Sequence, residues 1–241
     1  KSSVAEFYHQ ILIAQKIPVA SLGTLGIKVN KKVKKTKLTT LDIISIHREL
    51  TRIKTLGIDN VILEASSHGL VQGRLNGINF KTAIFTNFSQ DHLDYHKNMK
   101  TYLNAKLILF SKLLKTKQNI ITDNKILEFR KIQKIAEKKF LKLFTIGEKN
   151  STIQIRSIKP IGNSQNVFFR HSKKNYSVQI PLIGLFQIKN LFMSILAAKL
   201  SGLKIKKILH VVKNIKEING RLQLIETIPN QTKIFIDYAH T

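Results

Sequence analysis

The chain has 241 residues, of which 43% are hydrophobic and 23% are charged, the balance of a globular protein large enough to bury a core. It contains no cysteine, which excludes disulfides, zinc–thiolate centres and cysteine nucleophiles. No apolar run reaches the roughly 18 residues that cross a bilayer. The chain starts at Lys1 without a basic-then-apolar leader, so we expect a cytoplasmic protein with no membrane partner.

The net charge of +27 has two possible explanations. A lysine-rich surface binds nucleic acid by releasing counterions, but abundant lysine, isoleucine and asparagine also arise from a compositional bias of the coding DNA. The lysines are scattered over residues 31–37, 131–142 and 204–216 without interleaved aromatic residues or a nucleic-acid motif. We therefore favour the bias and expect no nucleic-acid partner, although a basic surface still attracts acidic molecules such as nucleotides.

Hydrophobic spacing predicts alternating helices and strands in the first part of the chain. We expect helices over residues 3–15, 43–57 and 102–114, and strands over 18–20, 61–63 and 82–86. A turn is expected at residues 23–26 and a basic loop at 31–37. Thr39 stands three residues before Asp42, which is the spacing of a capping box before the second helix.

The alternation continues with strands over residues 119–122 and 143–145 around a charged helix over 125–139. This order predicts an α/β fold with a mostly parallel, doubly wound sheet. After Gly147, period-two segments over 152–158, 167–169 and 176–180 predict a small antiparallel patch beside that sheet. Helices over 187–200 and 205–214 and a strand over 233–236 follow. We place a central domain at 1–218 and the start of a second domain at 219–241.

Polar residues gather where two of the predicted strands end. Glu64 ends one strand, and Asn87 ends the next. Open α/β sheets bind their ligands at this edge, so we expect both strand ends to face one crevice. The loops after them carry further polar groups: Ser66, His68, Gln72, Arg74, Asp91, His92, Asp94 and His96. Glu64 with His92 suits a metal ion, whereas His96 is explained more simply as part of a helix cap.

Two of these segments carry a family resemblance. Glu64-Ala-Ser-Ser-His-Gly-Leu70 and Thr86-Asn-Phe-Ser-Gln-Asp-His-Leu-Asp-Tyr-His96 resemble signatures of the Mur ligases, in particular of the branch that adds the third stem-peptide residue of peptidoglycan. Shorter runs match in the same order: Lys1-Ser2-Ser3 the end of a phosphate loop, residues 38–42 a substrate loop, Asn104-Ala-Lys106 a modified-lysine motif, Asn219-Gly-Arg221 a nucleotide contact, and residues 237–241 the entry to a C-terminal ligase domain. The Ser-Ser-His-Gly-Leu run separates that branch from the D-Ala-D-Ala-adding ligase and from folylpolyglutamate synthase.

The resemblance implies roles for individual residues. The residues implied in catalysis are Lys1, Glu64, His92 and Lys106, the last as N6-carboxylysine, because a carbamate can approach a metal that an ammonium would repel. Those implied in binding ATP are Lys1, Ser2, Ser3, Asn87, Asn190, Arg221, Asp237 and His240. Those implied in binding two magnesium ions are Ser2, Glu64 and His92. Those implied in binding the acceptor substrate are Thr39, Thr40, Ser66, Gln72, Arg74 and Lys106. Gln187 and Leu41 depart from the family's usual residues.

The implied function is ATP-dependent amide formation through an acyl phosphate in the bacterial cytoplasm. The enzyme would add meso-diaminopimelate or L-lysine to UDP-N-acetylmuramoyl-L-Ala-D-Glu and would be a monomer. The sequence does not choose between the two amino acids, since the selecting residues belong to the C-terminal domain of the family. The alternatives are a Mur-type ligase with another acceptor, a basic nucleic-acid-binding protein, or a piece of an enzyme that is inactive alone.

Overall fold

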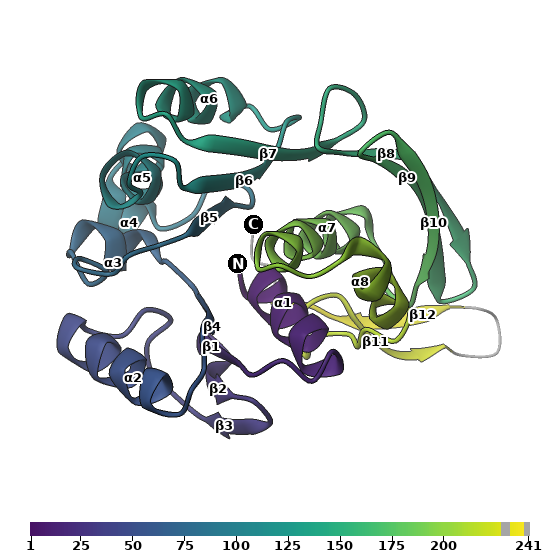
Figure 1. The fold of residues 1–241 in the computed structure, drawn as a ribbon, viewed down its shortest axis with the longest axis horizontal. Coiled ribbons are helices and arrows are strands. Elements are labelled where there is room, and N and C mark those ends of the chain that lie inside the picture. The colour runs from purple at the N-terminus through teal and green to yellow at the C-terminus, as the bar shows by residue number, and fades with distance from the viewer. Residues whose placement is uncertain (228–231, 239–241) are drawn as a thin grey trace.

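The computed structural model describes residues 1–227 and 232–238 and has the α/β fold that the alternating pattern predicts (Figure 1). Its helices are α1 (Ser2–Ala14), α2 (Ile43–Thr55), α3 (Ser67–Val71), α4 (Leu93–His96), α5 (Met99–Ile108), the π-helical turn η1 (Leu109–Leu113), α6 (Phe129–Lys138), α7 (Leu185–Leu200) and α8 (Ile205–Val212). Its strands are β1 (Val19–Gly23), β2 (Gly26–Val29), β3 (Lys32–Lys34), β4 (Asn60–Leu63), β5 (Thr82–Phe85), β6 (Asn119–Asp123), β7 (Lys142–Gly147), β8 (Ile153–Ile161), β9 (Ser164–His171), β10 (Lys174–Ile180), β11 (Gln223–Thr227) and β12 (Lys233–Ile236). Within the described ranges, no helix is long and apolar enough to cross a membrane.

A four-stranded sheet has the order β3-β2-β1-β4. β1 pairs antiparallel with β2 and parallel with β4. Every residue of β1 is buried, as expected for a strand that is covered on both faces. The amide of Glu64 donates to the carbonyl of Leu22 at 2.8 Å, so the parallel pairing holds the first residue after β4 beside the end of β1.

A six-stranded sheet has the order β10-β9-β8-β7-β6-β5. The neighbouring strands from β5 to β8 run parallel. β9 runs antiparallel to β8, and β10 runs antiparallel to β9. Ile120 and Ile121 of β6 face opposite sides of this sheet and belong to different hydrophobic clusters. Both faces of the parallel part are therefore covered, as a doubly wound sheet requires.

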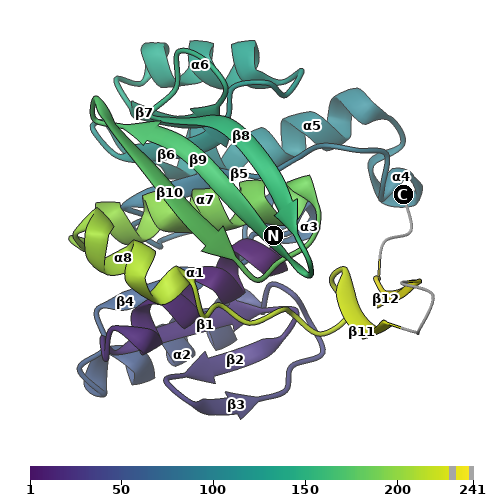
Figure 2. The ribbon, with the colours of Figure 1, turned by 90° about the vertical axis from the view of Figure 1, so that its right-hand side faces the viewer.

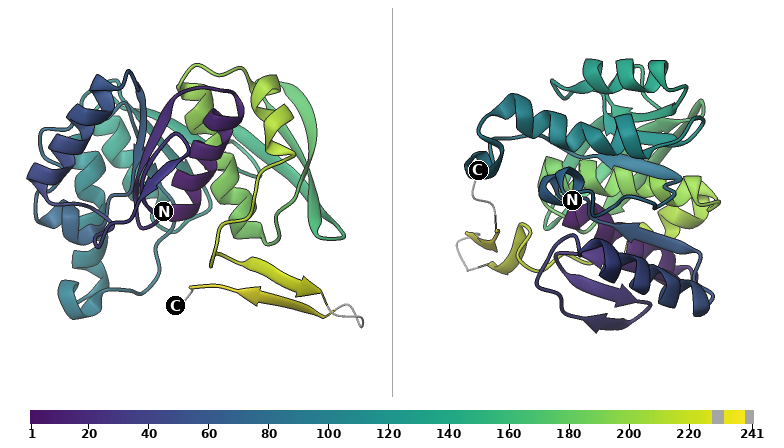
Figure 3. Two further views of the ribbon diagram at one scale, coloured as in Figure 1. Left: turned by 90° about the horizontal axis from the view of Figure 1, so that it is seen from below. Right: turned by 90° about the vertical axis from the view of Figure 1, so that its left-hand side faces the viewer.

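Three helices fill the space between the two larger sheets. Figures 1 and 2 show α1, α7 and α8 there, while α2 covers the other side of the four-stranded sheet and α5 and α6 lie on the far side of the six-stranded one. α7 is buried around most of its circumference, which agrees with its largely apolar sequence. The hairpin of β11 and β12 projects from this body (Figures 2 and 3).

Four details differ from the sequence-based expectations. The stretch expected as a basic loop contains the edge strand β3, whose exposed basic side chains suit a sheet edge. Asp42, not Thr39, caps α2, because its side chain accepts from the amide of Ser45 at 2.9 Å. The antiparallel strands continue the main sheet instead of packing beside it, since β7 and β8 pair through Ile146 and Ile153. β4 and β5 lie in different sheets, so the two strand ends are not hydrogen-bonded neighbours.

Candidate active site

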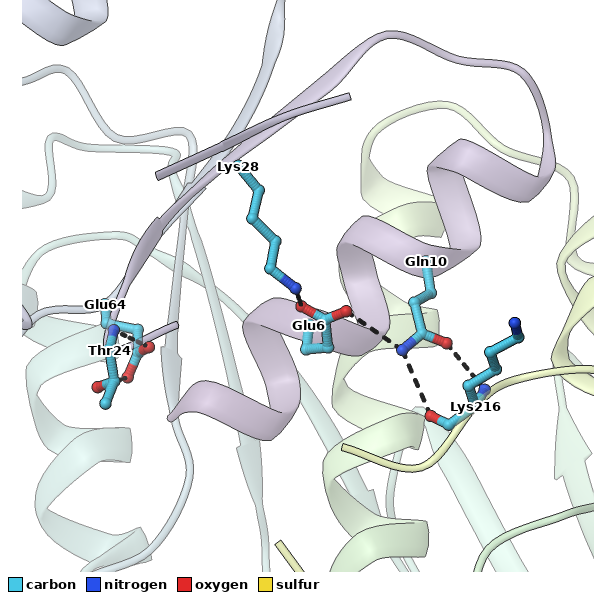
Figure 4. A network of polar contacts seen from close by, with 6 residues as sticks. All are labelled: Glu6, Gln10, Thr24, Lys28, Glu64 and Lys216. Atoms are coloured by element: carbon cyan, nitrogen blue, oxygen red, sulfur yellow. Dashed lines mark hydrogen bonds and ion pairs between the residues drawn. The ribbon is translucent and has the colours of Figure 1, made fainter. Parts of the chain in front are cut away.

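Glu64 is the buried carboxylate at the end of β4, with 4% of its surface exposed. The hydroxyl of Ser2 donates to its Oε2 at 2.9 Å, and the amide of Thr24 donates to its Oε1 at 2.8 Å. A Cβ on Gly23 would lie 2.1 Å from that Oε1, so only glycine leaves room for the carboxylate at the end of β1. Figure 4 shows the side chain of Glu64 against the backbone of Thr24. The carboxylate is thus fixed beside the first turn of α1.

The first turn of α1 matches what a phosphate-binding helix end requires. Lys1 is the N-cap residue, and its side chain makes no capping hydrogen bond to the amides of this turn. Ser2 and Ser3 are buried, and the hydroxyl of Ser2 is directed to Glu64 instead of to the helix. Uncapped amides and the helix dipole favour an anion at this position.

Thr40 lies under the loop that follows β4 and holds it in place. Its hydroxyl donates to the carbonyl of Glu64 at 2.7 Å and accepts from the amide of Ser66 at 2.9 Å. Its carbonyl accepts from Nη1 of Arg74 at 2.8 Å. A Cβ on Gly69 would lie 2.8 Å from the methyl of Thr40, so this close approach again requires glycine. The structure brings these expected substrate residues together, with the hydroxyl of Thr40 already occupied inside the protein.

Two further residues expected at the substrate lie at the edge of this group. The hydroxyl of Thr39 is 3.1 Å from that of Thr24, next to Glu64. Gln72 is exposed, and its Nε2 lies 3.4 Å from the hydroxyl of Tyr95. Both side chains remain accessible to a ligand.

Five rings pack together between α3, α4 and α5, and we call them the histidine cluster: His68, His92, Tyr95, His96 and Tyr102. The ring centroid of His68 lies 4.1 Å from that of Tyr95, 5.0 Å from that of His92 and 5.4 Å from that of His96. His96 stacks on Tyr102 with centroids 5.0 Å apart and planes at 28°. The cluster connects the loop after β4 to α5.

Burial and neighbouring charges lower the pKa of two histidines of the histidine cluster. Burial, and then the positive charge of His92, lower the pKa of His68. Burial likewise lowers the pKa of His96, with smaller contributions from the other two imidazoles. His92 has a left-handed backbone with φ 53°, and its Nε2 lies 3.3 Å from Oδ2 of Asp91. This geometry presents an imidazole and a carboxylate together on one loop.

Lys106 lies one turn after Tyr102 on α5, with its Nζ 4.9 Å from the centre of that ring. Burial, and then the positive charge at Lys1, lower its pKa from 10.5 to about 8. Burial, aided by the negative charge of Asp91, raises the pKa of Tyr102 to about 12. A solvated helix lysine has no such surroundings, so the structure favours a chemical role for Lys106.

Asn190 lies near the N-terminal end of α1 because α1 and α7 run parallel. The hydroxyl of Ser194 donates to the carbonyl of Val4 at 2.9 Å, and the hydroxyls of Tyr8 and Ser201 are 2.8 Å apart further along both helices. Asn190 precedes Ser194 by one turn. It therefore lies level with the first residues of α1, where the nucleotide is expected.

The segment that carries Arg221 is held by two glutamine side chains. Nε2 of Gln187 donates to the carbonyl of Arg221 at 2.6 Å. Gln10 of α1 accepts from the amide of Lys216 at 2.8 Å and donates to its carbonyl at 3.3 Å, and it also meets Glu6 (Figure 4). Glu6 in turn pairs with Lys28 of β2 at 2.5 Å. This network joins α1, the first sheet and the chain leading to β11.

The other residues expected to bind the nucleotide make no described contact with the first turn of α1. Asn87 is exposed and accepts from the hydroxyl of Thr86 at 3.2 Å. The guanidinium of Arg221 lies 5.7 Å from the ring centre of Tyr238, beside Asp237 in the chain. His240 lies outside the described residues.

The site suits a magnesium ion whose remaining ligands come from a bound nucleotide. Within residues 1–227 and 232–238, no three acidic or histidine side chains converge into a ready-made metal cage. Ser2 and Glu64 nevertheless bring two oxygen ligands within 2.9 Å of each other at a helix end suited to phosphate. Magnesium prefers oxygen ligands and is commonly bound by few protein groups together with substrate phosphates and water.

Several residues of the site escaped the sequence analysis. Gly23 and Thr24 were expected only as a turn, yet they hold the carboxylate of Glu64. Tyr95 and Tyr102 complete the histidine cluster but carry no local signal, because ring packing depends on tertiary contacts. His96 was expected as part of a cap, whereas Asn98 caps α5 and His96 is a buried member of the cluster.

Comparison with known proteins agrees with this geometry. Residues 1–198 match the Mur ligase middle domain. The UDP-N-acetylmuramoyl-L-alanyl-D-glutamate–2,6-diaminopimelate ligase of Rickettsia bellii (strain RML369-C) is 37% identical over 247 residues, which cover 100% of this chain and 51% of the relative. The ligase of the same name from Chelativorans sp. (strain BNC1) is 33% identical, with 100% and 50% covered.

Solved structures show the same fold. A structure of a ligase of that name superposes with a TM-score of 0.85 at 27% identity, covering 94% of this chain and 46% of the other. The apo form of L. casei FPGS, at 15% identity, has a TM-score of 0.76 and shares the fold, with 100% of this chain and 65% of the other covered. The chain spans about half the length of the curated relatives named here. By the match of its residues 1–198, it belongs to the Mur ligase family, as a middle domain.

Proposed function

We propose that this protein is an ATP-dependent ligase of peptidoglycan synthesis that joins an amino acid to UDP-N-acetylmuramoyl-L-Ala-D-Glu. The observation that carries the proposal is the contact of Ser2 with Glu64 at the uncapped start of α1. A hydroxyl, a buried carboxylate and helix amides at one point suit a magnesium-bound triphosphate. The names of the relatives favour diaminopimelate over L-lysine as the added amino acid.

The proposed reaction has two steps. The free carboxylate of the muramoyl-dipeptide attacks the γ-phosphorus of ATP, forming an acyl phosphate as the bond to the leaving ADP breaks. The amine of the incoming amino acid then attacks the acyl carbon, phosphate leaves with the former carboxylate oxygen, and the amine gives up a proton. Lys1 and the amides of α1 would neutralise charge when a carboxylate meets a triphosphate, which is electrostatic catalysis.

We assign a first magnesium ion to Ser2 and Glu64 and a second to His92. When bound, these ions would lower the repulsion between the reacting anions. Glu64 receives protein hydrogen bonds on both of its oxygens, so its position is set before any ion arrives. His92 lies on the loop that Asp91 and the histidine cluster hold.

The low pKa of Lys106 supports its modification to N6-carboxylysine. A neutral amine adds to carbon dioxide and releases a proton, giving a carbamate anion. With a pKa of about 8, roughly a tenth of the amine is neutral at neutral pH, whereas an ordinary lysine is neutral in about 0.04% of molecules. The carbamate would replace a buried cation by an anion that faces the metal side of the site.

The remaining residues are assigned to substrates. We place the muramoyl-dipeptide against Thr39, Ser66, Gln72, Arg74 and Lys106, while Thr40, which is buried, acts by holding the loop. We place ATP along the phosphate end of α1 and toward Arg221. The residues assigned to ATP are Lys1, Ser2, Ser3, Asn87, Asn190, Arg221, Asp237 and His240.

We further propose the organisation of the protein. Residues 1–218 form the central ATP-binding domain, and 219–241 begin a C-terminal ligase domain. The protein works as a monomer in the bacterial cytoplasm, without nucleic acid. Gln10 and Gln187 bond to Lys216 and to Arg221, which lie on either side of the proposed boundary.

The test is ADP release by the full-length protein with each acceptor. ADP release that requires UDP-N-acetylmuramoyl-L-Ala-D-Glu and diaminopimelate is expected. Release that instead requires L-lysine or D-Ala-D-Ala would assign another incoming amine, and release that requires a folate would assign another acceptor. Tight, salt-sensitive DNA binding without ADP release would contradict the proposal. Glu64→Gln and His92→Ala are each expected to lower the rate of ADP release at least about 100-fold. Near-normal turnover of either variant would contradict its proposed role as a magnesium ligand.

A further inference from the structure

His96 connects two active-site loops that the sheets leave unconnected. β4 and β5 belong to different sheets, so ladder hydrogen bonds do not fix the loop after one relative to the loop after the other. Nε2 of His96 lies 2.9 Å from the hydroxyl of Ser67, and both residues are buried, at 6% and 4% exposure. Ser67 begins α3 directly after the loop of Glu64, while His96 ends α4, one turn after His92.

The same imidazole reaches α5 on its other side. His96 stacks on Tyr102, and Nζ of Lys106 lies over that tyrosine ring at 4.9 Å. The hydroxyl of Thr101 donates to the carbonyl of His96, which adds a backbone link between the end of α4 and α5. Ser67, His96, Tyr102 and Lys106 therefore form one continuous row of contacts from the substrate loop to the reactive lysine.

An ordinary structural role does not account for this placement. Asn98, whose side chain accepts from the amide of Thr101 at 2.9 Å, caps α5, so His96 is not needed as a cap. An apolar residue would fill the same space without burying ring nitrogens that need partners. The row instead joins the loop of Ser67, next to the proposed acceptor site, to Lys106, next to the proposed metal site. The reaction requires these two sites to be aligned.

We propose that His96 is a positioning residue, which sets the loop of Ser66 and Ser67 against Lys106 through its bond to Ser67 and its stacking on Tyr102. The proposal rests on the proposed ligase function. It predicts that loss of the bond misplaces the acceptor carboxylate relative to the γ-phosphate, because displacements of about 1 Å lower rates by about 100-fold. Binding of ATP, which lies at the start of α1, should change little.

The experiment compares variants of the full-length ligase. His96→Phe keeps a stacked ring and loses the bond, and Ser67→Ala removes the same bond from the other side. Each is expected to lower kcat 10- to 100-fold while KM for ATP stays within threefold, and the double variant should be no worse than the more impaired single one. His96→Gln, whose amide can replace Nε2, should recover part of kcat.

The matched control is His171, another buried histidine, whose Nδ1 lies 2.9 Å from the carbonyl of Thr152 in the antiparallel part of the six-stranded sheet. His171→Phe should leave kcat unchanged even where it lowers stability. A folded His96→Phe enzyme with kcat within twofold of wild type would overturn the proposal. The proposal would also be overturned if the fold losses in kcat of His96→Phe and Ser67→Ala multiplied in the double variant.

A second readout separates this inference from the proposed function. Wild-type protein that forms no ADP with any acceptor would contradict the ligase function and leave kcat undefined. Amide hydrogen exchange then decides: His96→Phe should speed exchange in both α3 and α5, and His171→Phe in neither. Faster exchange confined to α4, or none, would overturn the positioning role by itself.

Discussion

Replacing Lys106 by methionine should stabilise the fold at neutral pH while removing the group that the proposed chemistry needs. Burial lowers the pKa of this lysine from 10.5 to about 8, which corresponds to about 3 kcal/mol of stability lost where the amine is protonated in both states. The contact with Tyr102 returns about 0.5–1 kcal/mol of that. Lys106→Met should therefore raise the free energy of unfolding by about 2 kcal/mol below pH 7.

The pH dependence gives this prediction its sign. Below pH 8 the half-buried amine is protonated in the folded state, and the full penalty applies. Between about pH 8 and 10.5 the folded state loses the proton before the unfolded state does, so wild-type stability rises relative to the variant. Above that window, the advantage of the variant should vanish.

The assay is urea unfolding of both proteins from pH 6 to 10 in buffers freed of carbon dioxide, which prevents carbamylation. Lys100→Met, an exposed lysine on the same helix, is the control and should change stability by less than about 0.5 kcal/mol. A Lys106→Met protein that is less stable than wild type at neutral pH would refute the reasoning. A difference in the free energy of unfolding that stays constant from pH 6 to 10 would refute it as well.

Two other substitutions test a close contact in the site and a buried ion pair between β6 and α7. Gly23→Ala places a methyl where the carboxylate of Glu64 now lies, so we expect ADP release by the full-length protein to fall at least about 100-fold, and retained activity would contradict the placement of Glu64. Lys189→Met leaves the buried carboxylate of Asp123 without its partner at 2.6 Å, which should cost about 3 kcal/mol in urea unfolding. Adding Asp123→Asn should recover part of that stability. A double variant as unstable as Lys189→Met would show that the unpaired carboxylate is not the cause of the lost stability.

The position of Glu64 was predictable because its signals are local. A short apolar strand followed by a carboxylate and small polar residues indicates a ligand-binding strand end, and the structure places Glu64 there with Ser2. The alternation of helices and strands likewise indicated the α/β class. Both conclusions depend on patterns within a few residues, which a sequence displays directly.

The histidine cluster and the division into sheets were not predictable in the same way. Nothing near β4 or β5 in the sequence tells which strand pairs with which, because pairing is decided by packing over long sequence separations. The partner of His96 is Ser67, far away in the chain, so the sequence suggested only a cap. β3 was missed for another reason, since an exposed basic edge strand lacks the apolar alternation that marks buried ones.

The central claim, that this site activates a carboxylate as an acyl phosphate, is tested most directly by following oxygen. The full-length protein is supplied with ATP, diaminopimelate and muramoyl-dipeptide in which all oxygens of the two D-Glu carboxylates are isotopically labelled, and the released phosphate is analysed by mass spectrometry. The proposed route predicts one labelled oxygen in each phosphate, because the bridging oxygen of the acyl phosphate leaves with it. Unlabelled phosphate alongside amide product, or label in AMP, would contradict the account.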